Sequence, residues 1–448
     1  MEAAAGLRMT QFAGRNGSQI MVQEVLAPGP QERYDLDAND ESLSLLQALK
    51  GRYGDICRVP TVSRANDGLV IHDVECIRRV LLTNRGNYVK GVGLERVRVL
   101  LGNGLIVSEG ELWSRQRRMM QPAFHSQVIR GFTVLMQRFN QELVERWAGH
   151  AARDEPINLT RELSDVALNV VLQALFSTDL DRLIEAEGGS PFDLLTRETR
   201  RDLPFAAKFR ALTRHVLAMI DARRKEQRIE MDLLSMLMEA RDKDSGEAMP
   251  PRALLDEVMT LIVAGHETTA STLNWTWYLL SQHPAVEARL HEALAAEAPG
   301  EEPTAPPAYV QQVLQEALRL YPPVWLFSRR ALGDDRLGDY HVPAGTDIFI
   351  CPYLLHRHAA HWEQPEQFDP ARFAPAVADA RHGFAFLPFS AGPRYCIGAA
   401  FAMAEMTTHL AMVARRFRLV YAAAAAPEPE FQINLRTRQD LPMRVVVR

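Results

Sequence analysis

Cysteine is scarce in this chain, which argues against a secreted fold held by disulfides. Only four cysteines occur in 448 residues (Cys57, Cys76, Cys351 and Cys396), and their spacing shows no pairing. Disulfide frameworks occur mainly in small extracellular domains, whereas cytosolic thiols stay reduced. The sequence therefore predicts free thiols and a cytoplasmic protein.

Long apolar runs are also missing. No segment supplies the roughly 20 consecutive apolar residues that a membrane-spanning helix needs. Residues 1–25 contain no apolar stretch of signal-peptide length. We therefore expect a soluble protein with no membrane anchor.

Positive charge is not in excess either. The chain has 51 basic and 56 acidic residues, and its formal net charge is −5. Nucleic-acid-binding domains usually carry a basic excess, so nucleic acid is not an expected partner. Only five of the basic residues are lysine and the rest are arginine, a bias typical of a GC-rich bacterial genome.

A glycine motif for dinucleotide binding is absent as well. The nearest match, Gly102 and Gly104, has Val107 where the third glycine should stand. The fingerprint needs all three glycines for its tight turn and its close approach to the pyrophosphate. The chain is therefore not expected to bind a nicotinamide cofactor itself.

What the sequence does contain is a mainly helical pattern in one domain. Residues 1–30 end in Pro and Gly and are typical of a flexible arm. Residues 31–448 show no composition break, so we expect a single domain there. A short amphipathic helix is predicted at 41–50, and strands are predicted at 55–60 and 68–73.

The second half of the pattern is dominated by one long helix. Apolar residues recur at helical spacing through most of 111–298, and residues 254–282 are apolar on nearly all faces. A helix that is apolar all round is normally buried in the middle of a large domain. Strands are predicted within 328–351 and a last helix from about 397. The predicted class is mainly α with a small antiparallel β region.

One cysteine stands in an unusual setting. The segment from Phe389 to Gly398 has Gly392 to shape a tight loop, Arg394 to supply a cation, and Cys396 just before the last predicted helix. A lone cysteine is more often a small buried hydrophobe. Here the helix N-terminus and the cation would stabilise a thiolate, which is the form that binds a metal.

This segment closely resembles the haem-binding signature of the cytochrome P450 family, Phe-x-x-Gly-x-Arg-x-Cys-x-Gly. All five defined positions are met, by Phe389, Gly392, Arg394, Cys396 and Gly398. The resemblance extends over roughly residues 40–448 and implies the cytochrome P450 fold with haem b. It makes Cys396 the axial ligand of the iron, whose thiolate favours O–O cleavage, and places Phe389 at the haem.

A second motif interrupts the long predicted helix. Ala264, Gly265, Glu267 and Thr268 lie in the segment AGHETT, where small and hydroxyl residues could simply kink or pack the helix. The resemblance gives them another role, in oxygen activation. Glu267 and Thr268 would deliver protons to the bound dioxygen, Ala264 would line the haem, and Gly265 would leave room for dioxygen over the iron.

Trp113 and Arg117 lie four residues apart, on one face of a predicted helix. Their plain interpretation is a core tryptophan and a solvent-facing arginine. The resemblance implies instead that both donate hydrogen bonds to a haem propionate, since such charge-assisted bonds are strong.

Further propionate donors follow from the same resemblance. Arg394, Arg329 and Lys90 are the candidates, Lys90 being the weakest of them. Arg330 is the alternative to Arg329, because the alternation of side chains along a strand turns only one of the two inward.

Glu316, Arg319 and Arg372 form a predicted structural triad. Alone, Glu316 and Arg319 could be an exposed helical ion pair of little consequence. Their apolar surroundings, VLQEALRLYPP, favour burial, where both charges need partners. The resemblance supplies Arg372 as the third member, with a role in assembly beneath the haem loop.

His356, His358 and His361 have the look of a metal site. A structural zinc site needs a complete ligand set with supporting contacts, and no cysteine or carboxylate pattern completes this one. We therefore interpret the stretch as a connecting segment and not as a metal centre.

The implied reaction is the insertion of one oxygen atom from dioxygen into a lipophilic small molecule of fatty acyl, terpenoid or polyketide type. Electrons would come from NAD(P)H through a separate reductase and a ferredoxin or flavodoxin. The substrate pocket would draw on the segment after Lys90, on residues 176–210 and on Val263, Ala264, Val324, Trp325, Leu326 and Phe327.

Two alternatives remain open at this point. One is a peroxide-driven haem-thiolate enzyme, isomerase or dehydratase, and the other is a non-enzymatic haem sensor. The first class commonly lacks an acid–alcohol pair, and a sensor would have no use for one, so Glu267 and Thr268 argue against both.

Overall fold

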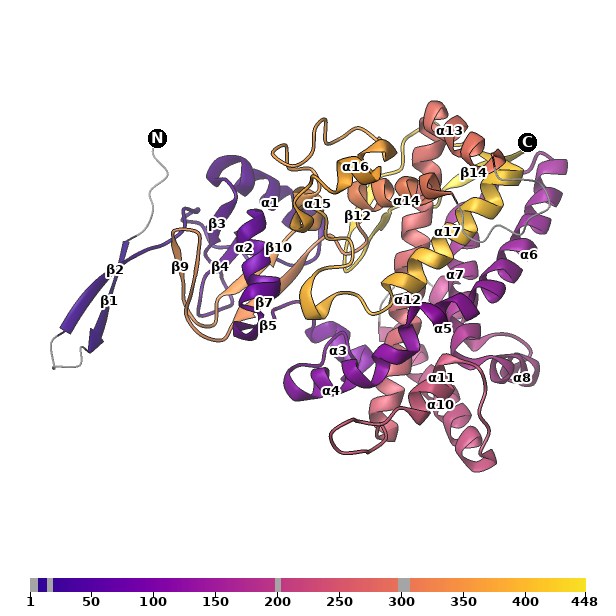
Figure 1. The fold of residues 1–448 in the computed structure, drawn as a ribbon, viewed down its shortest axis with the longest axis horizontal. Helices are drawn as coiled ribbons and strands as arrows, with labels where there is room; N and C mark the ends of the chain where they lie inside the picture. The colour runs from indigo at the N-terminus through magenta and orange to yellow at the C-terminus, as the bar shows by residue number, and fades with distance from the viewer. Residues whose placement is uncertain (1–6, 14–18, 198–202, 297–306) are drawn as a thin grey trace.

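The long helix α12 (Pro251–Gln282) runs through the middle of the molecule (Figure 1). Most of its residues are buried, as its apolar sequence predicts. It packs against α7 (Leu159–Phe176), α14 (Ala308–Leu320) and α17 (Ala399–Arg416). The computed structural model describes residues 7–13, 19–197, 203–296 and 307–448.

The other helices surround this centre. α1 (Asp40–Tyr53) corresponds to the helix predicted at 41–50, and the Asn39 side chain caps it by accepting the N–H of Ser42. The remaining helices are α2 (Val74–Arg78), α3 (Glu95–Leu101), α4 (Gly110–Met120), α5 (Ser126–Gly131), α6 (Thr133–Ala152), α8 (Thr178–Glu187), α9 (Leu194–Arg197), α10 (Leu203–Glu226), α11 (Leu233–Glu239), α13 (Pro284–Ala295), α15 (Pro352–Leu355) and α16 (Pro375–Ala378).

The largest sheet lies to one side of the helices, next to α1 and α2 (Figure 1). In spatial order its strands are β3 (Ile56–Val59), β4 (Gly68–Ile71), β10 (Asp347–Ile350), β7 (Phe327–Ala331) and β5 (Tyr88–Lys90). The prediction of an antiparallel sheet was wrong at one place, because β10 pairs parallel with β4. A parallel neighbour needs a long connection, and 275 residues separate these two strands along the chain.

Four smaller antiparallel sheets complete the fold. In one of them, β14 (Pro442–Val447) lies between β11 (Phe417–Tyr421) and β6 (Ile157–Asn158). The other three are strand pairs: β12 (Pro429–Phe431) with β13 (Leu435–Thr437), β8 (Asp335–Leu337) with β9 (Tyr340–Val342), and β1 (Leu7–Ala13) with β2 (Gln19–Val25). The β1–β2 hairpin projects away from the other elements (Figure 1). The flexibility expected of this arm stays a prediction.

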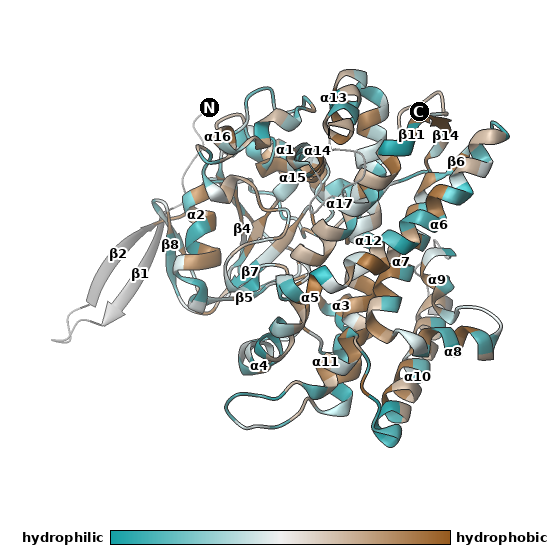
Figure 2. Cartoon of the chain, turned by 45° about the vertical axis from the view of Figure 1, so that its right-hand side comes forward, coloured by the Kyte–Doolittle hydropathy of each residue, from teal (hydrophilic) through white to brown (hydrophobic). Residues whose placement is uncertain are grey.

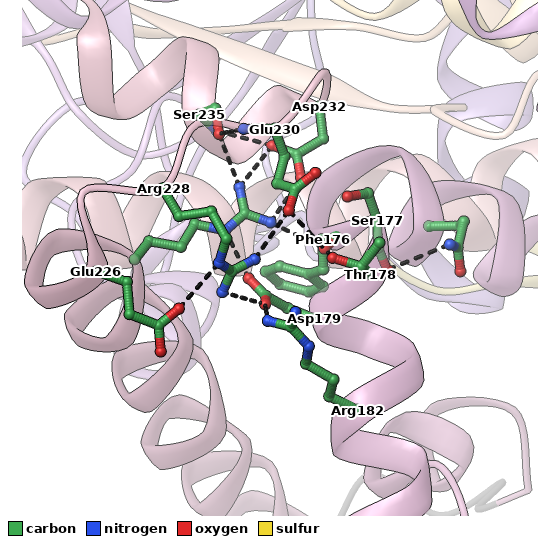
Figure 3. A network of polar contacts seen from close by, with 12 residues as sticks. Phe176, Ser177, Thr178, Asp179, Arg182, Glu226, Arg228, Glu230, Asp232 and Ser235 are labelled. Atoms are coloured by element: carbon green, nitrogen blue, oxygen red, sulfur yellow. Dashed lines mark hydrogen bonds and ion pairs between the residues drawn. The ribbon is translucent and has the colours of Figure 1, made fainter.

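A buried charge network joins α7, α8, α10 and α11 (Figure 3). The fully buried Arg223 donates to Asp179 at 2.5 Å and to both oxygens of Asp232 at 2.6 and 2.7 Å. Arg228 also binds Asp179, at 2.6 Å, and reaches Glu230. Each buried charge thus has a partner, which offsets the cost of taking it out of water.

Apolar residues gather on α7 and α12, whereas the outer turns of the surface helices are hydrophilic (Figure 2). No single helix among the described residues is long and apolar enough to cross a bilayer. Helices α7 and α8 taken together meet the length and apolar composition of a membrane span, but the chain bends by 114° between them.

Candidate active site

Cys396 lies in a tight loop that leads into α17. Its N–H donates to the carbonyl of Phe389 at 3.0 Å, and the N–H of Tyr395 donates to the carbonyl of Gly392 at 3.0 Å. Gly392 has a φ of +68°, and a Cβ there would lie 2.0 Å from the carbonyl oxygen of Leu81. Only glycine fits this position, so the loop geometry depends on it.

The Cys396 thiol differs from the other thiols in its exposure. Among the four cysteines it alone is exposed, while burial raises the pKa of the other three to about 12. Surrounding protein also raises the pKa of Cys396, and the N–H groups of Gly398 and Ala399 and the Arg117 guanidinium oppose this shift. These donors favour the thiolate, the form that ligates a metal.

A cluster of buried cations lies beside this loop. Arg329 on β7 is 8% exposed, and burial and the nearby Arg394 lower its pKa to about 10. Lys90 on β5 has its pKa lowered to about 7, first by burial and then by Arg394. Arg394 binds the carboxylate of Glu109 and stacks over the ring of Trp113, 4.4 Å from its centroid.

This cluster fits a doubly negative group. The Nη1 atom of Arg394 is buried and has no hydrogen-bond partner in the described part of the chain. Arg329 and Arg394 lie near the carboxylate of Glu109, which Arg394 binds. Lys90 lies 3.9 Å from Glu109, and its Nζ donates to the carbonyls of Leu105 and Ser108, each at 2.8 Å. Buried charges need counter-charges, and the two propionates of a haem would supply them next to the Cys396 loop.

The two neighbouring arginines of β7 point in opposite directions. Arg330 donates to both oxygens of Asp347, at 3.0 and 2.8 Å, and lies half-exposed. Arg329 is left to face Arg394 and Glu109. Strand alternation therefore selects Arg329 for the cation cluster.

The Thr268 side chain is half-buried on α12. Its hydroxyl donates to the carbonyl of Ala264 at 2.9 Å, one turn earlier. Glu267 is 27% exposed, and its Oε1 lies 4.0 Å from Nη1 of Arg436. The acid and the alcohol are thus adjacent in sequence and both accessible on an otherwise buried helix.

The structure gives Gly265 a packing role on α12. A Cβ at this position would lie 2.8 Å from Cγ2 of Val171 on α7. Glycine is therefore needed for the close approach of α7 and α12, and its expected role in leaving room for dioxygen stays a prediction.

Glu316 and Arg319 are fully buried on α14. Arg319 donates to both oxygens of Glu316, at 2.6 and 2.7 Å. Its other N–H groups donate to the carbonyls of His356 and Pro365, at 2.9 and 2.6 Å, and of Gln367 at 3.0 Å. All five N–H groups of the guanidinium thus have acceptors. The ion pair fastens α14 to the segment that precedes the cysteine loop.

Arg372 lies at the edge of this pair. Its Nε is 3.4 Å from Oε1 of Glu316, and its Nη2 donates to the carbonyl of Gln364 at 3.0 Å. The backbone N–H of Asp369 donates to the same Oε1 atom at 2.9 Å. Burial raises the pKa of Glu316, although these donors and Arg319 oppose the shift.

The three histidines do not converge. His356 is buried, its Nε2 accepts the N–H of Leu387 at 2.8 Å, and burial lowers its pKa to about 3. His358 lies 2.8 Å from Asp55 instead. In the described residues no group of three or more His, Cys, Asp or Glu side chains could hold a metal ion.

Some site features were not found from the sequence. Glu109, which binds Arg394, is separated from it by 285 positions. Glu257 on α12 accepts the N–H of Leu105 at 2.9 Å, and burial raises its pKa to about 7. The partner of each carboxylate lies far away along the chain, so no local sequence pattern could identify either one.

The residues expected to line the substrate pocket differ in how far they are buried. Trp325 is 1% exposed and donates to the carbonyl of Gln432 at 2.6 Å, so it packs in the core and does not line a pocket. Val324 is exposed, and Leu326, Phe327 and Val263 are half-buried. Part of the expected segment 176–210, residues 198–202, lies outside the described residues.

The mainly helical fold, the exposed Cys396 in its tight loop, the neighbouring cations and the acid–alcohol pair on the central helix are the arrangement expected of a haem-thiolate enzyme. The family model for cytochrome P450 matches residues 32–187 and 190–443. The chain therefore belongs to the cytochrome P450 family and is a cytochrome P450 monooxygenase, and the family implies haem as its cofactor. The predictions of family, fold class and enzyme class are confirmed.

Several curated relatives support this assignment. Cyclooctatin synthase of Streptomyces melanosporofaciens is 35% identical over 81% of this chain and 82% of its own length. Pentalenene oxygenase of Streptomyces avermitilis is 32% identical over 79% and 82%. The crystal structure of the cytochrome P450DA heme domain shares 23% identity with a TM-score of 0.79, covering 95% of this chain and 98% of its own.

Proposed function

We propose that this cytochrome P450 inserts oxygen into a cyclic terpenoid. The observation that carries the proposal is the nature of its relatives, among them cyclooctatin synthase, pentalenene oxygenase and a cyclooctat-9-en-7-ol 5-monooxygenase that is 36% identical over 77% of this chain. The apolar side chains of Val263, Leu326 and Phe327 suit a hydrocarbon skeleton.

The electrons would come from another protein. The chain has no dinucleotide fingerprint, so we propose that a ferredoxin or flavodoxin delivers them from NAD(P)H through its own reductase, in the cytoplasm. Cytochrome P450 enzymes generally use such partners.

Haem, when bound, supplies the activation of dioxygen, which no side chain can perform. Cys396 would hold the haem iron through its thiolate and donate electron density to it. Arg329, Arg394 and Lys90 would neutralise the propionates and fix the orientation of the ring. On the other side, Glu267 and Thr268 would hold and move protons toward the dioxygen site.

The substrate class can be tested with a ligand panel on the purified haem protein. Cyclic terpene hydrocarbons, their monohydroxylated derivatives, fatty acids and macrolactones of similar apolar area would be compared by haem absorbance change and by product formation with a supplied ferredoxin system. We expect the terpenoids to bind most tightly and to be oxidised. Faster turnover of the fatty acids would contradict the proposal.

Replacing Thr268 with alanine should uncouple electron use from product formation. Without the hydroxyl, proton delivery loses selectivity, so electrons should still be consumed while peroxide replaces product. Thr269→Ala is the matched control, because Thr269 makes the same bond to the preceding turn, at 3.1 Å, but is buried away from the site. If Thr268→Ala remains fully coupled, its hydroxyl has no role in proton delivery.

A further inference from the structure

Strand β13 is fixed to the central helix beside the acid–alcohol pair. The Ser271 hydroxyl donates to the carbonyl oxygen of Leu435 at 2.6 Å, and both residues are buried. Ser271 lies one helical turn after Glu267, on the same face of α12. The next residue of β13 is Arg436, so this bond sets the register that brings Arg436 to Glu267.

Arg436 is held on its other side by a second carboxylate. Its Nε donates to Oε2 of Glu430 at 2.7 Å, whereas its Nη1 is 4.0 Å from Oε1 of Glu267. A hydrogen bond needs a shorter separation. The guanidinium is therefore anchored on Glu430, and it attracts Glu267 by charge without binding it directly.

The charged groups around Arg436 and Glu267 do not compete for their contact. Arg438 lies 3.7 Å from Glu430 and is itself bound to Asp40. Arg436 is 31% exposed and Glu267 27% exposed, so both keep contact with water. Among the ion pairs of the described residues, Glu267 approaches no cation other than Arg436.

We propose that Arg436 is a positioning residue for proton delivery and that Glu430 keeps its hold on Glu267 weak. Arg436 would keep the Glu267 carboxylate on the β13 side of α12, where it takes a proton from water. Because no hydrogen bond between Glu267 and Arg436 has to break, the Glu267 side chain can then turn and pass the proton to the hydroxyl of Thr268. The hydroxyl gives up its bond to the carbonyl of Ala264 as it releases its own proton toward the dioxygen site. The inference rests on the proposed roles of Glu267 and Thr268.

Three variants test this arrangement by their different outcomes. Arg436→Gln should keep substrate affinity, measured from the haem absorbance change, while product per electron pair falls roughly three- to tenfold and peroxide rises. This decrease is small compared with the about 10²–10⁴-fold contribution to the rate that proton-transfer groups themselves make. Glu430→Gln should free Arg436 to bind Glu267 directly, so electron consumption should slow without a peroxide leak. Arg436→Lys should restore most of the coupling.

The solvent deuterium isotope effect on turnover distinguishes a role in proton delivery from a merely structural role, which would leave it unchanged. It should change in Arg436→Gln and in Glu430→Gln, and Arg436→Gln should have no further effect in a Glu267→Gln background. Normal coupling in Arg436→Gln would overturn the inference, and so would a loss of substrate affinity alone, since that would make Arg436 a substrate contact. If Glu267→Gln itself leaves turnover unchanged, the proposed proton role of Glu267 fails first.

Discussion

Replacing Arg319 with alanine should give a protein that does not retain haem. The substitution would leave the Glu316 carboxylate fully buried without its main partner and would strip three carbonyls, those of His356, Pro365 and Gln367, of their donor. Breaking a buried ion pair from one side costs roughly 3–5 kcal/mol. A domain is stable by only about 5–15 kcal/mol, so the loss is a large share of the total.

The effect should reach the haem site through a short chain of contacts. Arg319 binds the carbonyl of His356, and the His356 ring accepts the backbone N–H of Leu387. Leu387 lies two residues before Phe389, whose carbonyl accepts the N–H of Cys396. Loosening the ion pair therefore loosens the cysteine loop, so the expected defect is in cofactor retention and not only in melting temperature.

The measurement is haem content per chain together with thermal unfolding. Arg336→Ala is the matched control, because Arg336 and Asp339 form another i,i+3 pair, at 3.5 Å, that is largely exposed. Exposed pairs contribute about 0–1 kcal/mol, so the control should keep its haem. Arg319→Lys should fail nearly as badly as alanine, since lysine cannot reproduce the forked donor pattern. Full haem content in Arg319→Ala would show that the pair is dispensable.

The sequence could predict features that depend on residues close together along the chain. The all-round apolar pattern of 254–282 predicted the central helix, and the i,i+3 spacing of Glu316 and Arg319 in apolar surroundings predicted a pair that the structure shows buried. The segment from Phe389 to Gly398 was sufficient to recognise the family, because its five defined positions fall within ten residues.

Features that depend on distant parts of the chain could not be predicted. Glu109 meets Arg394 only because β5 and α4 are folded against the cysteine loop. The need for glycine at position 265 depends on how closely α7 packs there. The hydrogen bond of the Trp325 ring goes to the carbonyl of Gln432, 107 residues later. Each is a tertiary contact with no local pattern in the sequence.

Replacing Cys396 with serine should abolish monooxygenase activity altogether. A serine hydroxyl stays protonated at neutral pH, so it cannot supply the electron density that a thiolate gives to haem iron. The N–H groups of Gly398 and Ala399, which favour a charged sulfur, would face a neutral oxygen. We expect the reduced protein with carbon monoxide to lose the red-shifted Soret band of thiolate ligation, and product formation to fall below detection.

The other three cysteines are the controls that make this test specific. Cys57, Cys76 and Cys351 are buried, and burial raises the pKa of each thiol to about 12, so none can act as a thiolate at neutral pH. Alanine at each of these positions should therefore preserve the band, at a cost in stability alone. A wild-type spectrum typical of histidine ligation, or a red-shifted band that survives in Cys396→Ser, would contradict the assignment. Because Cys396 alone among the four thiols is exposed and shares its loop with Arg394, no other cysteine of the chain can take its place.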